Sequence, residues 1–332
     1  MAKSPNQKLK LLYLLKMLEE KTDEENTMTI NEMIAELDRY GITAERKSIY
    51  DDLEALKHYG LDIAIRKSKT TDYFVAGRLF ELPELKLLVD AVQCSKFVTH
   101  KKSNELIKKI ESLASTHQAM SLHRQVYVSN RVKTINESIY YNVDRLHAAI
   151  AENKQVSFKY FDYDIKKEKV YRKSGNRYSV SPYGLSWDDE NYYLVTFSHK
   201  YNDFTHYRVD RMADIVLSEV SRELLPDNEQ FNIAEYSKKV FNMFGGEEVT
   251  VKLKFDNSLV NAVVDRFGKE IVIGKLEDDS FSIWIKVAVS STFFAWLSQF
   301  GAKVKILSPE TVIEKYKIHM SEIIDQYSTK DK

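Results

Sequence analysis

The sequence is poor in cysteine, proline and glycine. Cys94 is the one cysteine among 332 residues, which include 5 prolines and 10 glycines. A single cysteine excludes an intrachain disulfide and any metal site built on a cysteine pair, and it suits a reducing compartment. The sequence has no run of about 18 apolar residues and no apolar segment typical of a secretory signal near its start. These absences predict a cytoplasmic protein with no membrane partner.

The sequence also has no excess of charge of either sign. It carries 49 Lys and Arg against 49 Asp and Glu. No global field therefore draws it towards nucleic acid, and any such contact must come from local patches. The length is enough for two or three domains, and the composition is typical of globular proteins.

The common signatures of catalysis are missing. No cysteine pair and no HExxH, GxxxxGK[ST] or GxSxG segment occurs. The acidic segment 188–190 has ligands for Mg²⁺, but its place between two strand-like runs predicts a hairpin turn. The spacing of His100, His117 and His123 fits no common metal site. We therefore predict no enzyme activity, no catalytic or metal-binding residues and no cofactor.

Residues 1–80 carry the pattern of a winged helix-turn-helix domain. Apolar residues at helical spacing predict three helices, over 7–20, 30–40 and 44–59. Thr29 and Glu32 fit the capping box of the second helix, and Gly60 is the expected end of the third. Two short strand-like runs, 63–65 and 73–75, follow as a ribbon. In domains with this order of elements, the third helix enters the DNA major groove.

Cations and polar side chains gather at the two places where such a domain meets DNA. The start of the third helix and the ribbon tip supply the candidate DNA-binding residues Arg46, Lys47, Ser48, Tyr50, Arg66, Lys67 and Lys69. No acid lies among residues 63–71, which suits phosphate contact. Residues 1–78 hold 13 Lys and Arg against 14 Asp and Glu, so a three-helix protein-binding module is the alternative.

The middle of the chain changes from helical to strand patterns. Residues 81–141 are predicted to form a helical linker, which opens with Pro83 in a first turn. Short strand-like runs in residues 142–223 predict a small β-barrel. Within residues 154–177, eight cations and three acids are interleaved with aromatic residues. This pattern suits single-stranded nucleic acid, because cations follow its backbone and rings stack on its bases. The alternative is a solvated basic hairpin with core tyrosines.

A polar cluster ends the strand-like run that begins at Phe204. Arginines this close to tyrosines favour anion recognition or ring stacking. Strand alternation predicts two faces: His206, Arg208 and Asp210 on one, and Tyr207, Val209 and Arg211 on the other. A solvated strand end with two structural salt bridges is the alternative.

This central part resembles the WYL domain of bacterial transcriptional regulators. The matching segments are Pro182-Tyr183-Gly184-Leu185, Tyr192-Tyr193-Leu194 and Tyr207-Arg208-Val209-Asp210-Arg211, with Tyr192 where the family usually has Trp. The resemblance implies a small Sm/SH3-like barrel that senses a ligand. It implies an effector surface at Tyr160, Tyr183, Tyr193, His206, Arg208 and Arg211. The effector classes left open are a nucleotide, a short single-stranded nucleic acid and another anion.

Residues 246–328 carry the order β-α-β-β-α-β, which predicts a ferredoxin-like domain. They resemble the C-terminal extension of WYL-domain proteins through Trp296-Leu297-Ser298-Gln299-Phe300-Gly301 and Ser308-Pro309-Glu310. This resemblance implies a role in dimerisation and effector coupling.

Residues 48–60 resemble the recognition helix of the winged-helix domains that precede WYL domains, with Asp51 where that family usually has Arg.

Together these patterns predict a multidomain α+β protein. We expect a bacterial, homodimeric transcriptional regulator that binds a double-stranded DNA operator. An anionic or nucleic-acid effector at the central domain would change its operator affinity. A nucleic-acid-processing enzyme and a protein-binding scaffold are the alternatives.

Overall fold

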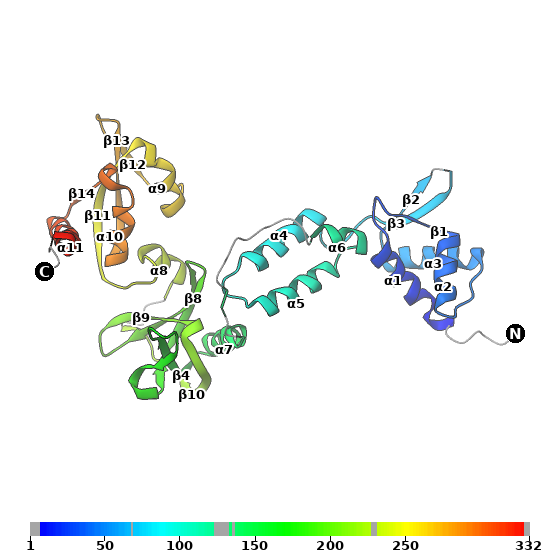
Figure 1. Ribbon diagram of the computed structural model, residues 1–332, viewed down its shortest axis with the longest axis horizontal. Coiled ribbons are helices and arrows are strands. Elements are labelled where there is room, and N and C mark those ends of the chain that lie inside the picture. Colours follow the sequence, from blue (N-terminus) through cyan, green and yellow to red (C-terminus); the bar gives the residue numbers. More distant parts are fainter. Residues whose placement is uncertain (1–6, 68, 123–132, 135–136, 227–230, 329–332) are drawn as a thin grey trace. The chain divides into compact units, whose positions relative to one another are not determined.

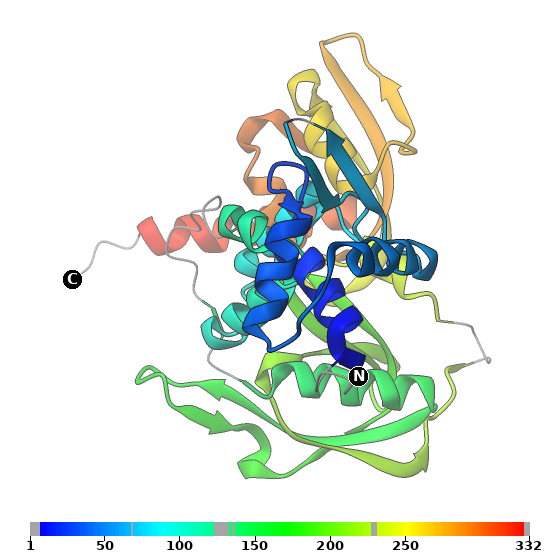
Figure 2. The same cartoon turned by 90° about the vertical axis from the view of Figure 1, so that its right-hand side faces the viewer.

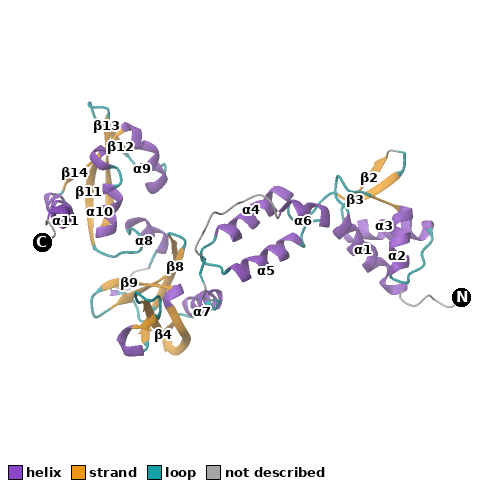
Figure 3. Cartoon of the chain, in the orientation of Figure 1, coloured by secondary structure: helices purple, strands orange, loops and turns teal. Residues whose placement is uncertain are grey.

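The computed structural model describes residues 7–67, 69–122, 133–134, 137–226 and 231–328. The chain divides into two compact units, Met1–Glu137 and Ser138–Lys332, which are described separately (Figure 1). Helices make up most of the first unit, and the second combines helices with several sheets (Figure 3). Within the described residues, no helix is long and apolar enough to cross a membrane. His123 lies outside the described residues.

The first part of unit 1 packs helices beside a small antiparallel sheet. Its elements are α1 (Lys10–Lys21), β1 (Met28–Thr29), α2 (Ile30–Arg39), α3 (Arg46–Tyr59), β2 (Ile63–Lys67) and β3 (Thr71–Val75), with the strand order β1-β3-β2. The predicted apolar stripes meet in one core, in which Leu14, Leu37 and Leu53 of the three helices are buried. The ribbon joins the same core through Tyr73 and Val75. Amphipathic helices of this kind are stable because each buries its apolar face against the others.

Local signals set the ends of these helices. The Thr29 hydroxyl accepts a hydrogen bond from the Glu32 amide (3.2 Å), and the Glu32 carboxylate accepts one from the Thr29 amide (2.7 Å). The predicted capping box is therefore confirmed. Gly60 ends α3 with φ of 114°, a left-handed conformation that glycine adopts at little cost.

The second part of unit 1 is a small helical layer. Its helices are α4 (Leu82–Cys94), α5 (His100–Glu111) and α6 (Thr116–Leu122), and they share a core that includes Leu85, Val89, Ile107 and Leu122. The sequence patterns left α6 unassigned. Ser115 stands just before it and makes two bonds: its hydroxyl accepts the Gln118 amide (3.0 Å) and donates to the carboxylate of buried Asp23. The loop after α1 and the start of α6 are thereby held together.

The first part of unit 2 forms two antiparallel sheets beside one helix. Its elements are α7 (Ile139–Ala151), β4 (Lys154–Tyr163), β5 (Lys169–Tyr171), β6 (Tyr178–Val180), β7 (Pro182–Asp188), β8 (Asn191–Ser198), β9 (Asp203–Arg208) and β10 (Met212–Ser221). One sheet has the order β10-β4-β5, with β6 also paired to β4, and the other has the order β7-β8-β9.

The predicted small barrel is not closed. In the described residues, no strand of one sheet is hydrogen-bonded to a strand of the other. The chain changes sheets at buried Ser181 and again in the 3-10 turn Val209–Arg211. At the second corner, the Arg208 amide donates to the Tyr160 hydroxyl (3.2 Å). A side chain of one sheet therefore meets the backbone of the other at this corner.

The second part of unit 2 begins with α8 (Ile233–Lys239) and continues as a helix-covered sheet. Its elements are β11 (Glu247–Asp256), α9 (Val260–Phe267), β12 (Ile273–Lys275), β13 (Ser280–Val289), α10 (Ser291–Ser298), β14 (Val304–Ser308) and α11 (Glu310–Ser328). The predicted order β-α-β-β-α-β is observed, and the sheet order is β12-β13-β11-β14. The core joins Val263, Phe293 and Leu297 of the helices to Val251 and Ile283 of the sheet. Helices α9 and α10 lie along the long β11–β13 pair (Figures 1 and 2).

The capping box gives a first testable prediction. Replacing Thr29 with Ala should lower the free energy of unfolding by about 1 kcal/mol, because the Glu32 amide loses its acceptor at the start of α2. Thr29→Ser keeps the hydroxyl and should change stability little. Urea unfolding followed by circular dichroism compares the two variants, and an Ala variant as stable as wild type would show that the cap contributes nothing.

Candidate functional site

Tyr160 lies in a cluster of aromatic rings between the two sheets. Its ring centroid lies 5.4 Å from that of Tyr207 and 6.2 Å from that of Tyr178, and Phe158 stacks on Tyr178 at 5.6 Å. Only 7% of Tyr160 is exposed, and burial raises the pKa of its hydroxyl. Tyr160 therefore offers little surface to a ligand, and its ring supports the residues around it.

A carboxylate beside this cluster is shared by two arginines. Arg172 donates to both oxygens of Asp162 (2.5 and 3.1 Å), and Arg211 donates to its Oδ1 (3.2 Å). The hydrogen bond from Arg172 holds the pKa of Asp162 below its usual range. We call Asp162, Arg172 and Arg211 the carboxylate clamp. Two guanidinium groups on one carboxylate leave the clamp with an excess of positive charge.

Aromatic rings surround the carboxylate clamp. The Arg172 guanidinium lies 5.1 Å from the ring centroid of Tyr160, and that of Arg211 lies 5.4 Å from Tyr163. About half of the Arg172 side chain and a quarter of the Arg211 side chain are exposed (53% and 27%). The buried Nε of Arg211 has no hydrogen-bond partner among the described residues. Exposed guanidinium groups over rings suit an anion that carries a flat group.

Arg208 belongs to a separate ion pair. Its Nε and Nη2 donate to the two oxygens of Asp210 (3.0 and 2.8 Å), and Nη2 also donates to Asn191 (2.8 Å). Strand β9 ends at Arg208, so the predicted strand alternation stops there, and the 3-10 turn brings Asp210 back to the arginine. Buried Tyr193 stands opposite Arg208 in the β8–β9 register. The donors of Arg208 are thus largely occupied within the domain.

His206 and Tyr183 lie nearer to the segment around α8. His206 Nε2 lies 2.8 Å from the Tyr236 hydroxyl of α8, and their rings stack. The Tyr183 ring contacts Phe204 and Phe231, and its hydroxyl donates to the Glu223 carbonyl. The six residues predicted as one effector surface therefore have different surroundings. Of these six, the carboxylate clamp contains Arg211, and Tyr160 supports it.

The sequence patterns did not single out Asp162 and Arg172. The excess of cations in residues 154–177 marked the right segment but not the right pair. Asp162 stands opposite Val170 in the β4–β5 register, and the chain leaves β5 into a 3-10 turn at Arg172. Arg172 follows Val170 by two residues, so the β4–β5 register brings it to the same side as Asp162 and within reach of its carboxylate.

The acidic segment Asp188 to Glu190 forms the predicted hairpin turn. Strand β7 ends at Asp188 and β8 begins at Asn191, and Asp189 and Glu190 have positive φ values of 43° and 60°. Two successive positive φ values are typical of the tight turn that joins antiparallel strands. Among the described residues, no group of three or more His, Cys, Asp and Glu side chains is placed to hold a metal ion.

The predicted DNA-binding residues lie on the surface of unit 1 with one exception. Arg46, Lys47 and Tyr50 are exposed on the first turns of α3, whereas Ser48 is half-buried and accepts a hydrogen bond from Lys10 of α1. At the ribbon, the three predicted cations Arg66, Lys67 and Lys69 are exposed.

Two acids of this domain form ion pairs with cations outside the predicted DNA-contact regions. Asp52 pairs with Lys10 (2.6 Å), and Glu36 pairs with Lys21 (2.5 Å). By contrast, the cations of the two predicted DNA-contact regions form no ion pair with any residue that the structure describes: Arg46, Lys47, Arg66, Lys67 and Lys69. The even balance of charge in this domain therefore conceals a surface of unpaired cations.

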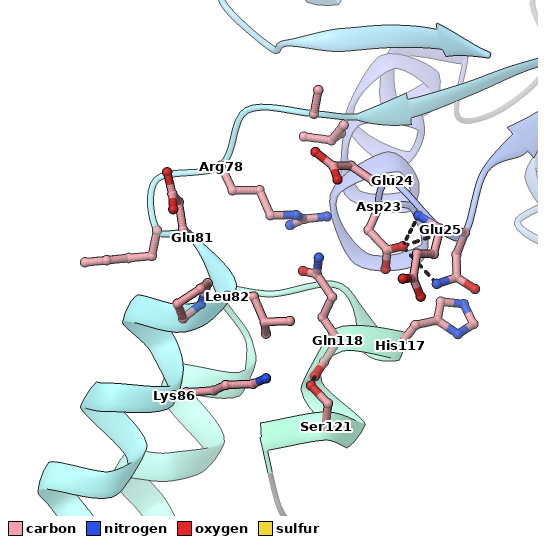
Figure 4. Close-up of a pocket in the computed structure, with 15 residues that line it drawn as sticks. Asp23, Glu24, Glu25, Arg78, Glu81, Leu82, Lys86, His117, Gln118 and Ser121 are labelled. Carbon is pink, nitrogen blue, oxygen red and sulfur yellow. Dashed lines mark hydrogen bonds between the residues drawn. The ribbon is translucent and has the colours of Figure 1, made fainter. Parts of the chain in front are cut away.

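A cavity of about 770 Å³ lies in unit 1 between the loop after α1, the connection from β3 to α4, and α6 (Figure 4). Inside it, the carboxylate of Asp23 accepts hydrogen bonds from the Asn26 amide and the Ser115 hydroxyl. Arg78 Nη2 donates to the carbonyls of Glu19 and Thr22 (2.7 and 2.6 Å). The walls carry both acids and cations, so the cavity has no marked preference for a ligand of one charge. Its polar side chains mainly join the N-terminal core to the helical layer.

The His206–Tyr236 contact gives a prediction on pH. Burial lowers the pKa of His206 to about 4, against an unfolded value near 6.5. As the pH falls, the unfolded chain binds a proton at His206 before the folded protein does. The contribution of neutral His206 to stability is therefore fully present above about pH 6.5 and is lost as the pH drops towards 4. The loss should reach about 2 kcal/mol at pH 5. Urea unfolding at pH 7.5 and pH 5 should show a smaller loss in His206→Gln, and equal losses in both proteins would contradict the assignment.

Two segments of unit 2 match known domains. Residues 141–217 match the WYL domain, and residues 247–324 match the WCX domain. Comparison with curated proteins finds no match. Among solved structures, the chain is similar to proteasome accessory factor B/C (PafBC) of Arthrobacter aurescens, at 16% identity and a TM-score of 0.29. The alignment covers 96% of this chain and 48% of the PafBC chain, so this protein spans about half the length of PafBC. The protein therefore contains a WYL domain followed by a WCX domain.

Proposed function

We propose that this protein is a DNA-binding transcription regulator whose WYL domain senses an anionic effector. The observation that carries the proposal is the set of unpaired cations at the start of α3 and on the β2–β3 ribbon. These are the two elements that contact the duplex in winged helix-turn-helix domains. The proposal includes a homodimer that reads a two-fold operator, and it includes no catalytic role.

The DNA-binding part of the proposal rests on how α3 is held. Lys10 of α1 reaches Asp52 and Ser48, so it anchors the buried side of α3 while Arg46, Lys47 and Tyr50 stay exposed. A helix braced on one side and polar on the other fits the major groove. The exposed cations of the ribbon then suit the phosphates beside it.

The sensing part of the proposal rests on the carboxylate clamp. A phosphate or similar anion would compete with Asp162 for the guanidinium groups of Arg172 and Arg211, because a guanidinium group forms paired hydrogen bonds with phosphate oxygens as it does with carboxylate oxygens. The exposed ring of Tyr163 beside Arg211 offers a stacking surface for a base. The effector class favoured is thus a nucleotide or a short single-stranded nucleic acid with a terminal phosphate.

The ribbon gives a prediction on DNA affinity. Lys67→Ala should weaken binding to duplex DNA of any sequence and lower the slope of log affinity against log salt by about 0.9, because one phosphate contact is lost. Lys109→Ala, an exposed charge change on α5, is the matched control. Fluorescence anisotropy with a labelled duplex at several salt concentrations measures both. If the two variants lose affinity alike, the ribbon has no special role.

The start of α3 gives a separate prediction on specificity. DNA capture with the purified protein identifies the operator, and Arg46→Ala should then lose roughly 1–3 kcal/mol of discrimination between the operator and unrelated DNA. The reason is that this side chain would contact base edges and not phosphates alone. An Arg46→Ala protein with wild-type discrimination would place sequence reading elsewhere.

The carboxylate clamp predicts opposite changes in oligonucleotide affinity for two substitutions. Arg172→Gln should weaken binding of a 5′-phosphorylated oligonucleotide about tenfold, since a hydrogen bond to a charged group contributes about 1.5–3 kcal/mol. Asp162→Asn should strengthen it, because the competing carboxylate is removed. Lys166→Gln, an exposed change of equal charge in the same domain, is the control. Calorimetric titration distinguishes these results, and a purely structural salt bridge would give no gain in affinity with Asp162→Asn.

A further inference from the structure

Only one face of the WCX sheet is covered by the helices of the WCX domain itself. Helices α9 and α10 pack on the face that carries Val251, Ile283 and Ile285. The other face carries Trp284 of β13, and 57% of this residue is exposed. Strands β13 and β11 are the two central strands of the order β12-β13-β11-β14. The largest ring of the sheet therefore stands on a central strand, on the face opposite α9 and α10.

Lysines surround this ring in register. Lys252 of β11 pairs directly with Trp284, and its ammonium lies 5.3 Å from the ring centroid. Two residues away on the same face stand Lys254 of β11 and Lys286 of β13, and Lys305 of β14 pairs with Lys254. The face thus presents one aromatic ring among four lysines.

These lysines are not a general property of the domain. Residues 247–328 contain 10 Lys and Arg against 12 Asp and Glu, so the domain is slightly acidic, yet four of its ten cations stand together on this face. Lys254 pairs with Asp278, and Lys286 pairs with Glu248. Lys252 and Lys305 form no ion pair with any residue in the described part of the chain. Two lysines beside the ring are therefore available to an anion.

The other end of the same face is already occupied. Ala288 of β13 packs with Tyr193, Val240 and Met243 in a small core that joins the WCX domain to the WYL domain. Glu248 also receives Lys239 from α8. Within the described residues of unit 2, the end of this face around Trp284 remains open. Trp284 lies on β13, the strand whose Ala288 packs against the WYL domain.

We propose that the open face around Trp284 binds single-stranded nucleic acid by stacking an unpaired base on the indole. Four-stranded sheets with helices on one face use aromatic residues of their strands in this way, and lysines beside the ring follow the phosphates. A base on Trp284 would displace the Lys252 ammonium towards the adjacent phosphate. A duplex offers no unpaired base, so it binds this face only through charge.

A protein partner fits this face less well. The buried centres of protein interfaces are depleted in lysine, whereas here lysines surround the one large apolar side chain. In a symmetric contact between two copies of the chain, the lysines of one copy would meet those of the other. Repulsion of that kind disfavours a dimer seam but suits a polyanion.

The test uses the full-length protein and fluorescein-labelled single strands of twelve thymidines or twelve uridines, with anisotropy as the readout. Trp284→Ala should weaken binding about tenfold or more, the size expected for one base–aromatic stack. Trp284→Tyr should stay within about threefold of wild type because it keeps an aromatic ring. Lys252→Ala should lower the salt slope by about 0.7, whereas Lys269→Ala, an exposed control in the loop after α9, should not.

Further measurements distinguish this site from the carboxylate clamp and from a protein interface. In an Arg211→Gln background, Trp284→Ala should still cause the same loss. If Arg211→Gln removes all binding and Trp284→Ala changes nothing, the clamp alone binds the strand and the present proposal is wrong. A Trp284→Ala protein with unchanged oligonucleotide affinity but an altered mass in light scattering would assign the face to protein contact. If Trp284→Ala lowers the affinity for a duplex as much as the affinity for the single strand, stacking of an unpaired base is excluded. A difference between the thymidine and uridine strands distinguishes DNA from RNA.

Discussion

The hydrogen bond from the Arg208 amide to the Tyr160 hydroxyl fixes the geometry of the WYL domain. It closes the corner at which the chain leaves β9 and enters β10, where the two sheets share no strand pair. Rings packed around Tyr160 keep its hydroxyl at this place. Because a buried amide without an acceptor is costly, the bond holds the corner in one conformation. That conformation sends the side chain of Arg208 to Asp210 and that of Arg211 to Asp162.

The two arginines illustrate why a charge count says little about recognition. Both form ion pairs, as the alternative interpretation of the sequence expected. Ion pairs near the surface contribute little to stability, typically 0–1 kcal/mol, so their main effect is to hold side chains in place. Arg208 has donors occupied by Asp210 and Asn191, whereas the buried Nε of Arg211 has no partner among the residues that the structure describes. The same contrast separates Lys10, which pairs with Asp52, from the unpaired cations on α3 and the ribbon.

Local signals explain which parts of this fold could be predicted from sequence. The capping box of Thr29 and Glu32, the terminating Gly60 and the acidic hairpin turn depend on residues a few positions apart, and each is observed. The order of elements in the C-terminal domain follows from the same kind of pattern. Other features depend on distant residues. Tyr160 of β4 meets the amide of Arg208 of β9, and Arg211 of the 3-10 turn meets Asp162 of β4. No periodicity encodes either contact.

Contacts continue from the corner at Arg208 into the WCX domain. Tyr193 stands opposite Arg208 in the β8–β9 register and packs with Val240, Met243 and Ala288, the last of which lies on β13. Arg266 of α9 donates to the Val240 carbonyl (2.9 Å) and lies over the Phe241 ring. Packed cores pass on a displacement because they have few voids to absorb it. A ligand shifts a conformational equilibrium only by the difference in its affinity for the two states. Under the proposed function, an effector anion would act by drawing Arg211 from Asp162 or Arg208 from Asp210, at the corner that these contacts join to Tyr193 and Ala288.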